Sequence, residues 1–294
     1  MSVFTTIIKQ LINGLQSGSI YALVALGYSM VYGIIMLLNF AHGDVIMVGA
    51  YIAWMMMARF AANPIIALIA AVIGCTVLGV LIEKAYKPLR QSPRISLLIT
   101  AIGVSYFLEN VAQLIFGANA HVIPTFIDDT PIQLGRIAIP TTALITVIVA
   151  GISMVALNVL VKKTRMGKAM RAVSEDAGAA QLMGININNT ISFTFAVGSA
   201  LAGIGSVLYC CAYPKATPTM GSMLGLKAFV AAVLGGIGSI PGAMAGGFAI
   251  GIAEALVSSA GLSEWKDGVV FAILIVVLLV KPTGLMGRPM TEKV

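Results

Sequence analysis

The chain has 294 residues, of which 59% are hydrophobic and 10% are charged, and its formal net charge is +7. Soluble domains average about 25% charged residues, so this composition excludes an ordinary soluble protein and is typical of a membrane protein. The cations lie at the ends of apolar segments with no aromatic side chains interleaved, which argues against a nucleic-acid partner.

Apolar segments follow one another along the whole chain. A membrane-spanning helix needs roughly 20 apolar residues, and the conventional candidates are Ile7–Leu26, Val45–Ala58, Pro64–Ile82, Ile95–Phe116, Ile139–Val161, Thr190–Cys211, Pro241–Ser258 and Gly268–Val280. Two shorter segments, Gly27–Leu38 and Gly225–Ile237, end in polar or glycine-rich breaks. The sequence predicts an all-α, polytopic membrane protein with about eight transmembrane helices plus two short or broken helices. These form two pseudo-repeated halves of a single domain over residues 1–294.

The charged loops predict the orientation of the chain. Glu83–Arg94 carries four cations and one acid, and Lys162–Arg171 carries five cations and no acid. The C-terminal tail adds Lys281, Arg288 and Lys293. An excess of Lys and Arg marks the cytoplasmic side, so these three segments are expected inside the cell. The Gly117–Gly135 connection has Asp128 and Asp129 but no Lys or Arg, and is expected outside. The side on which the N-terminus lies stays open.

A weak internal repeat relates the two halves. Gly27–Tyr51 and Gly225–Phe248 each read as a short apolar helix, a polar or glycine break and a second, glycine-containing helix. Paired interrupted helices are typical of a translocation pathway, because unwound backbone at membrane depth must be satisfied by protein or water. We expect the two interruptions to meet near the middle of the membrane. The alternative is that both are ordinary loops between helices.

The first break, Asn39 to Asp44 (NFAHGD), is the densest polar cluster within an apolar stretch. Asn39, His42 and Asp44 are therefore candidate residues of a substrate pathway. The simpler interpretation is that Asn39 or Asp44 caps the following helix by accepting hydrogen bonds from its first N–H groups.

The second break, Leu234 to Gly242 (LGGIGSIPG), adds Gly235, Gly236, Gly238 and Pro241 to the candidate pathway. It is not a nucleotide-binding loop, because no Lys-Ser/Thr pair follows it. Its glycines permit close approach of backbones, as do the small residues of Gly242–Gly251.

Two acids, Glu109 and Glu254, fall inside apolar spans. A carboxylate in hydrocarbon costs at least a few kcal/mol, so each must face protein, water or a partner subunit, or be protonated. A proton relay would require several acids at helical spacing with a basic partner, which the sequence does not indicate. Hydrogen bonding between helices or a place near an interface is favoured for both.

Metal and cofactor sites are not indicated. Cys75, Cys210 and Cys211 lie in apolar segments without disulfide or metal spacing, and His42 and His121 fall in different environments. The chain also lacks a Walker A sequence and any nucleophile or paired-carboxylate arrangement typical of an enzyme. If ATP drives its function, another chain must hydrolyse the ATP.

The segment 162–188 between the two halves starts with a basic cluster and continues as an amphipathic helix. Because it is cytoplasmic by its charge and exposes an apolar face, we expect another protein to cover it.

Four stretches together resemble one family. They are Gly18–Tyr51, Arg165–Ile185 (RMGKAMRAVSEDAGAAQLMGI), Gly225–Gly247 and Leu278–Pro289. They look like the signatures of the permease subunits of bacterial ABC importers for branched-chain amino acids, and the resemblance covers essentially the whole chain.

The resemblance implies a multi-pass permease of the bacterial inner membrane that is not itself an enzyme. It implies as partners a second homologous permease, two cytoplasmic ATPase subunits, a periplasmic amino-acid-binding protein and membrane lipid. It also implies that Gly167–Gly184 docks into an ATPase. The residues assigned to this coupling contact are Gly167, Met170, Arg171, Val173, Glu175, Asp176, Leu182 and Gly184, with Met183 adding to the apolar face.

Two other functions remain possible from the residues alone. A single-chain, ion-coupled secondary transporter for small apolar solutes would need ion ligands within the membrane and should work as a single polypeptide. The other alternative is a membrane-integral enzyme or scaffold. The cytoplasmic segment favours the ATP-driven importer. A glycine-lined, aliphatic path without charge pairs suits Leu, Ile and Val better than Lys or Glu, although Ala or Thr could also pass.

Overall fold

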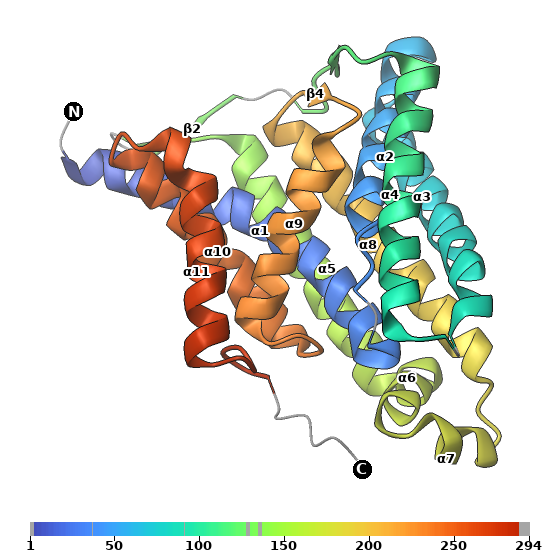
Figure 1. Cartoon of the computed structure of the whole chain (residues 1–294). Helices are drawn as coiled ribbons and strands as arrows, with labels where there is room; N and C mark the ends of the chain where they lie inside the picture. The colour runs from blue at the N-terminus through green and yellow to red at the C-terminus, as the bar shows by residue number, and fades with distance from the viewer. Residues whose placement is uncertain (1–2, 37, 91, 128–129, 135–136, 288–294) are drawn as a thin grey trace.

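The computed structural model describes residues 3–36, 38–90, 92–127, 130–134 and 137–287. Asp128, Asp129, Gly135, Arg288 and Lys293, which entered the orientation argument, lie outside the described residues. The chain folds into a bundle of helices with very short strands at one end (Figure 1). The all-α fold predicted from the sequence is confirmed.

The helices are α1 (Val3–Ile35), α2 (His42–Trp54), α3 (Pro64–Tyr86), α4 (Arg94–Phe116), α5 (Thr141–Lys163), α6 (Arg165–Glu175), α7 (Ala177–Leu182), α8 (Ile187–Ala212), α9 (Met220–Gly235), α10 (Ile240–Ser259) and α11 (Lys266–Val280). A π-helical turn, Met55–Arg59, extends α2, and short 3-10 turns occupy Lys87–Leu89 and Ser263–Trp265. Among the described residues, six helices are long and apolar enough to cross a membrane: α1, α3, α4, α5, α8 and α10. The expected number of about eight is not reached by this criterion, because α2, α9 and α11 are shorter.

The strands form two small antiparallel pairs. β1 (His121–Val122) pairs with β4 (Lys215–Ala216), and β2 (Ile132–Leu134) pairs with β3 (Ile137–Ile139). The β1–β4 pair fastens the connection after α4 to the connection after α8.

Helix α1 differs from the sequence prediction. The segments Ile7–Leu26 and Gly27–Leu38 were expected to be separate, but α1 runs without a break from Val3 to Ile35. Gly27 does not end the helix because it is buried inside it, where a β-carbon would lie 2.2 Å from the Nε2 atom of His42. Glycine at position 27 therefore makes room for His42 and does not interrupt the helix.

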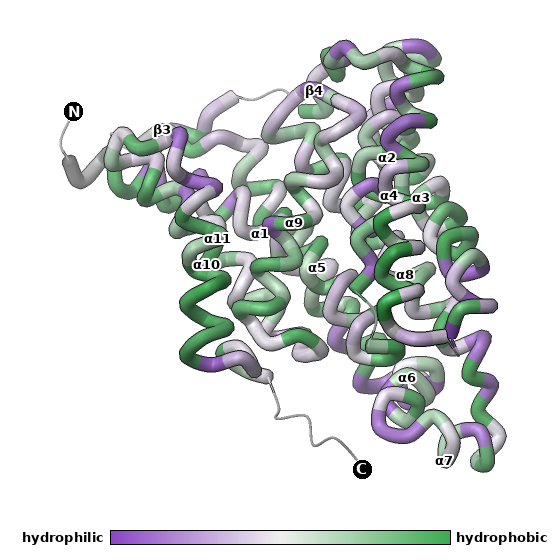
Figure 2. The backbone as a smooth tube through the Cα atoms, viewed as in Figure 1, coloured by the Kyte–Doolittle hydropathy of each residue, from purple (hydrophilic) through white to green (hydrophobic). Residues whose placement is uncertain are grey.

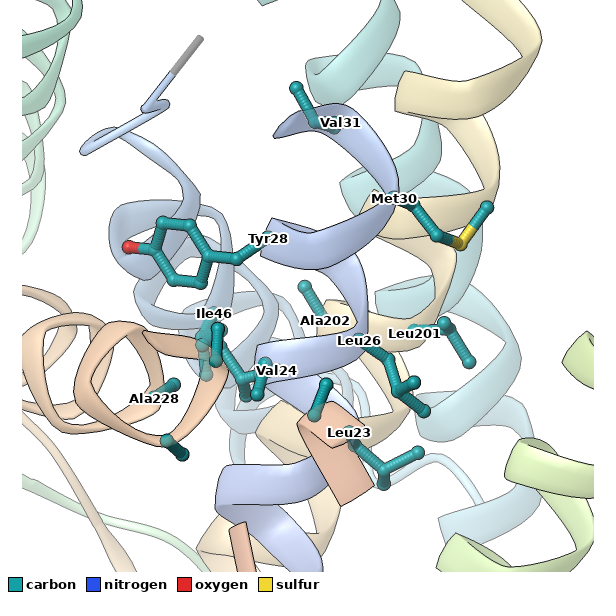
Figure 3. Packing of buried hydrophobic residues seen from close by; sticks show 14 of the residues in the cluster. Leu23, Val24, Leu26, Tyr28, Met30, Val31, Ile46, Leu201, Ala202 and Ala228 are labelled. Carbon is teal, nitrogen blue, oxygen red and sulfur yellow. The ribbon is translucent and has the colours of Figure 1, made fainter. Parts of the chain in front are cut away.

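The core surrounds α1. Leu23, Val24 and Leu26 are fully buried on this helix. Around them lie Ile46 from α2 and Ala228 from α9 (Figure 3). A helix surrounded by other helices has little exposed surface on any face, which explains why α1 shows no amphipathic pattern.

Helices α1 and α10 pack closely through small residues and run antiparallel. Gly14 lies against Ala255, and Gly18 lies against Phe248. A β-carbon on Gly251 would come within 2.3 Å of the backbone nitrogen of Gly18. Any larger residue at position 251 would force the two helices apart, so the close packing predicted for Gly242–Gly251 is confirmed.

The basic segments gather at one end of the bundle. The Arg90 guanidinium pairs with Glu83 and donates a hydrogen bond to Asn188 Oδ1 at 2.8 Å, which joins the α3–α4 loop to the start of α8. At the same end, the Leu285 N–H donates to the Leu234 carbonyl at 2.8 Å. Helices α6 and α7 complete this end, and the N-terminus of α1 lies at the opposite end (Figure 1). The positive-inside rule predicts that the end with the basic segments faces the cytoplasm, and hence that α1 begins on the outer side of the membrane.

The outer helices present apolar side chains to their surroundings. Ile69 on α3 and Ile99 on α4 are 52% and 63% exposed, although both are large aliphatic residues. Figure 2 shows hydrophobic stretches along α4 and α11 and hydrophilic ones in α6. This inverted distribution is the one that a lipid environment favours.

Candidate functional site

The first helix interruption lies between Ile35 and His42. Helix α2 begins after Ala41, whose side chain cannot cap it, and no side-chain capping bond is present there. Asn39 instead accepts a hydrogen bond at 2.9 Å from the hydroxyl of Tyr86 at the end of α3. The simpler interpretation of Asn39 and Asp44 as helix caps is therefore not what the structure adopts.

His42 and Asp44 are buried at the start of α2. The His42 ring meets the edge of the Tyr28 ring, with centroids 5.0 Å apart. Asp44 is 0% exposed, and within the described part of the chain neither of its carboxylate oxygens makes a hydrogen bond of normal geometry. Ser105 and Glu109 on α4 approach this carboxylate. Its position in the first turn of α2 is electrostatically favourable, because a helix N-terminus carries a partial positive charge.

The second interruption separates α9 from α10. Gly236 and Gly238 both have positive φ values, +102° and +88°, which side chains rarely adopt. Ser239 then starts α10 by accepting a hydrogen bond from the Gly242 N–H at 3.2 Å, with Pro241 in the first turn. The Met286 N–H donates to the Gly235 carbonyl at 2.9 Å, so the segment after α11 covers the end of α9.

The end of α1, just before the first interruption, approaches the second interruption. A β-carbon on Gly33 would lie 3.5 Å from the Cα atom of Gly238. A small cavity of about 90 Å³ at this point is also lined by Met170 and Arg171 of α6. The expected meeting point at mid-membrane stays a prediction, and the length of α10 argues against it for the second interruption, because 20 residues are enough to span a bilayer core from the first residue of this helix. The second interruption therefore lies at the end occupied by α6.

The segment 162–188 forms two helices rather than the single helix expected over Gly167–Gly184. Helix α6 starts at Thr164, whose Oγ1 accepts a hydrogen bond from the Gly167 N–H at 3.0 Å. Helix α7 starts at Asp176, whose Oδ1 accepts from the Ala179 N–H at 3.0 Å. It ends at Leu182, and Gly184, two residues further on, has a φ of +83°. Asp176 breaks the helix because an aspartate is a strong N-cap.

The apolar side chains of this segment divide into two groups. Met170 and Val173 are each only 4% exposed, because they pack against their own chain. The prediction that a partner protein covers Met170 and Val173 was wrong. Amphipathic spacing indicates an apolar face but does not tell whether the same chain or another protein covers it. Leu182 and Met183 are 90% and 83% exposed. Glu175 is exposed as well.

Arg171 is exposed and donates a long hydrogen bond, 3.4 Å, to the Lys162 carbonyl. Its remaining N–H groups are available to an acceptor outside the chain.

One polar cluster was missed by the sequence reasoning. Lys227 Nζ on α9 lies 2.6 Å from Glu254 Oε1 on α10 and 2.6 Å from Asp267 Oδ1 on α11. The Tyr21 hydroxyl on α1 donates to Glu254 Oε2 at 2.7 Å. The expectation that Glu254 has no basic partner was therefore wrong, and hydrogen bonding between helices is its observed role. A lone lysine within an apolar helix was the available signal.

These features define a polytopic membrane protein with two helix interruptions and a short two-helix segment, α6 and α7, at one end of the bundle. The chain belongs to the family described as the branched-chain amino acid transport system / permease component, whose model matches residues 10–278.

Curated relatives agree with this assignment over nearly the full length. The chain is 44% identical to the high-affinity branched-chain amino acid transport system permease protein LivH of Salmonella typhimurium, covering 99% of both chains. It is 43% identical to the permease protein BraD of Pseudomonas aeruginosa, covering 98% of both. Among solved structures, PsaBC from Streptococcus pneumoniae in complex with Fab aligns over 92% of this chain and 91% of its own, with a TM-score of 0.50 and 14% identity. That likeness concerns the fold alone.

Proposed function

We propose that this chain is the inner-membrane permease subunit of an ABC importer that translocates Leu, Ile and Val and is powered by ATPase subunits in trans. The observation that carries the proposal is the position of α6. Its buried face packs on the bundle next to Gly33, near the end of α1, and Gly238, in the second interruption. A protein that moves α6 therefore acts directly on the interrupted helices.

The chain's own features support a partner at this end. The segment has two exposed apolar side chains near its end, Leu182 and Met183, which water does not favour and which lie outside the predicted membrane spans. Arg171, on α6 of the same segment, is also exposed. Exposed apolar side chains and an exposed arginine on one segment are typical of a docking element, because Met and Arg are enriched at protein interfaces relative to the rest of the surface.

The partners proposed are two cytoplasmic ATPase subunits, a second homologous permease and a periplasmic binding protein. Family membership supports the existence of partner subunits, and the absence of a Walker A motif from the full sequence agrees with ATP hydrolysis elsewhere. Under this proposal Met170 and Val173 transmit force within the subunit, whereas Leu182, Met183 and Arg171 receive it.

The proposed path of the substrate runs along the interruptions. Gly235, Gly236, Gly238 and Pro241 form its cytoplasmic part next to α6, and Asn39, His42 and Asp44 form a deeper polar step. Asp44 supports this assignment because its carboxylate is buried without a hydrogen bond of normal geometry among the described residues. Burying such a group is costly, and native proteins that retain one often use it for function.

The test is reconstitution of the chain with its candidate partners in liposomes, followed by uptake of a panel of radiolabelled amino acids. We expect uptake of Leu, Ile and Val only when both permeases, the ATPases and the binding protein are present. Undiminished uptake by the chain alone would contradict the proposal.

A further inference from the structure

A polar cavity of about 310 Å³ opens at the end of the bundle opposite α6, where α1 and α10 lie side by side (Figure 1). Gln10, Asn13 and Ser17 line it from α1. Their spacing of three and four residues places them on one face of the helix. Glu254 lines it from α10 and Lys266 from the start of α11. A stripe of amides and hydroxyls on an otherwise apolar helix has no role in packing against lipid, so it indicates contact with something polar.

Gln16 lines the same cavity with an unsatisfied amide. Its side chain is buried, with the residue only 9% exposed, and Nε2 has no hydrogen-bond partner among the described residues. A buried donor without a partner is unfavourable. A ligand oxygen in the cavity would remove that cost once the enclosed amide turns its N–H groups toward the cavity.

Glu254 retains capacity for a ligand. Its two oxygens accept one hydrogen bond each, from Lys227 and Tyr21. An ionised carboxylate offers about four lone-pair sites, so further donors can bind. The cluster around it has one ammonium group, on Lys227, and two carboxylates, on Glu254 and Asp267. One negative charge is thus in excess on this side of the cavity, while the ammonium of Lys266 provides a positive charge at its edge.

We propose that this cavity is a binding site for the zwitterionic head group of a free α-amino acid on the outer side of the membrane. The ammonium group binds Glu254, and the carboxylate binds Lys266 and the Gln16 amide. The lining has no large aliphatic side chain, and its less polar residues are alanine, glycine and a tyrosine. The site would therefore recognise the head group and not an aliphatic side chain. The inference rests on the proposed function and adds a site to it, at the end where substrate would arrive from outside.

The first experiment measures binding of leucine by saturation-transfer NMR. The sample is the full chain, purified in nanodiscs with the subunits that accompany it and without binding protein. Alanine is expected to compete with leucine within about threefold, because the head group is shared. The compound 4-methylpentanoate, which lacks the ammonium, and 3-methylbutylamine, which lacks the carboxylate, are expected to bind at least about tenfold more weakly, since each loses a charge-assisted hydrogen bond. Equal binding of leucine and 4-methylpentanoate would overturn the proposal.

The second experiment locates the site. Lys266→Gln and Gln16→Leu are each expected to raise the leucine dissociation constant at least about fivefold. Lys215→Gln removes an exposed lysine at the same end, outside the cavity, and should leave binding unchanged. Unchanged binding in both cavity variants would overturn the site. If the wild-type complex nevertheless imports leucine with ATP, the head-group site is wrong and the transport proposal stands. Loss of ATP-driven uptake by a correctly assembled wild-type complex would instead refute the transport proposal.

Discussion

Lys227 Nζ donates a hydrogen bond to Glu254 Oε1 across 2.6 Å in the interior of the helix bundle. The pair joins α9, which precedes the second interruption, to α10, which follows it. Asp267 and Tyr21 extend the contact to α11 and α1. The backbone is continuous between α9 and α10 only through the second interruption. Away from that interruption, the ion pair between Lys227 and Glu254 joins the two helices.

Removing one partner of this pair should be costly. Lys227→Met leaves the Glu254 carboxylate buried without its cation, and we expect a loss of about 3–5 kcal/mol in the free energy of unfolding. Adding Glu254→Gln removes the stranded charge and should recover at least half of that loss. Denaturation of the purified chain in detergent measures both variants. An equal loss in the single and double variants would show that the pair does not act as a unit.

A methyl group at Gly27 should displace His42. Its β-carbon would lie 2.2 Å from His42 Nε2, and the histidine is buried on all sides. Gly27→Ala is expected to destabilise the chain by about 1–3 kcal/mol, as overpacking usually does. Gly27→Ala combined with His42→Ala should regain stability relative to the single variant. Gly103→Ala is the matched control, because a β-carbon at that position in α4 would have no contact within 4 Å in the described part of the chain. Comparable losses at the two glycines would contradict the packing argument.

Leu182 and Met170 should behave differently although both lie in the cytoplasmic segment. Leu182→Asp changes a side chain that is 90% exposed, so the unfolding free energy should change by less than about 0.5 kcal/mol. Co-purification of ATPase subunits should fall by at least about tenfold, the usual effect of losing an apolar anchor. Met170→Asp buries a charge and should destabilise the chain itself.

The control for Leu182 is Leu262→Asp, which alters a leucine that is 53% exposed at the opposite end of the bundle. It should leave ATPase retention intact. Arg171→Glu is expected to weaken retention as well, because the new carboxylate would face the acceptors that the guanidinium is proposed to bind. Retention of both ATPases by Leu182→Asp and Arg171→Glu would place the contact elsewhere.

Gly236 should hold the C-terminal segment against α9. Gly236→Ala combines a φ of +102° with a β-carbon 2.3 Å from the Gly287 nitrogen. We expect faster hydrogen exchange at the amides of Leu285 and Met286, which now donate to the α9 carbonyls. Gly261 has a similar φ of +81°, but a β-carbon there would meet no described atom within 4 Å. Gly261→Ala therefore measures the effect of backbone strain without a clash with the C-terminal segment. Equal exchange in the two variants would contradict this role.

Apolar length and turn residues were enough to predict most helices. Helix α3 starts at Pro64 as expected, because Asn63 accepts a hydrogen bond from the Ile65 N–H at 2.9 Å and the proline fits the first turn. Helix α4 ends at Gly117, which has a φ of +84°. The false break at Gly27 arose because sequence alone cannot tell a glycine that bends the chain from one that accommodates a neighbouring side chain.

The site was predicted less completely, for a similar reason. The two interruptions were located by their composition, but their depth depends on the lengths of complete helices such as α10. Lys227 and Glu254 are separated by 27 residues, and only the fold brings them together. Likewise, the spacing of Met170 and Val173 indicated an apolar face without indicating that α6 folds back on its own chain.

The source of energy for uptake tests the central claim most directly. Liposomes containing the assembled complex should accumulate leucine when ATP is present at the cytoplasmic face, with no sodium or proton gradient imposed. The same liposomes with a catalytically dead ATPase should not accumulate it, whatever gradient is applied. Accumulation driven by an ion gradient with the dead ATPase would contradict the account and support a secondary transporter.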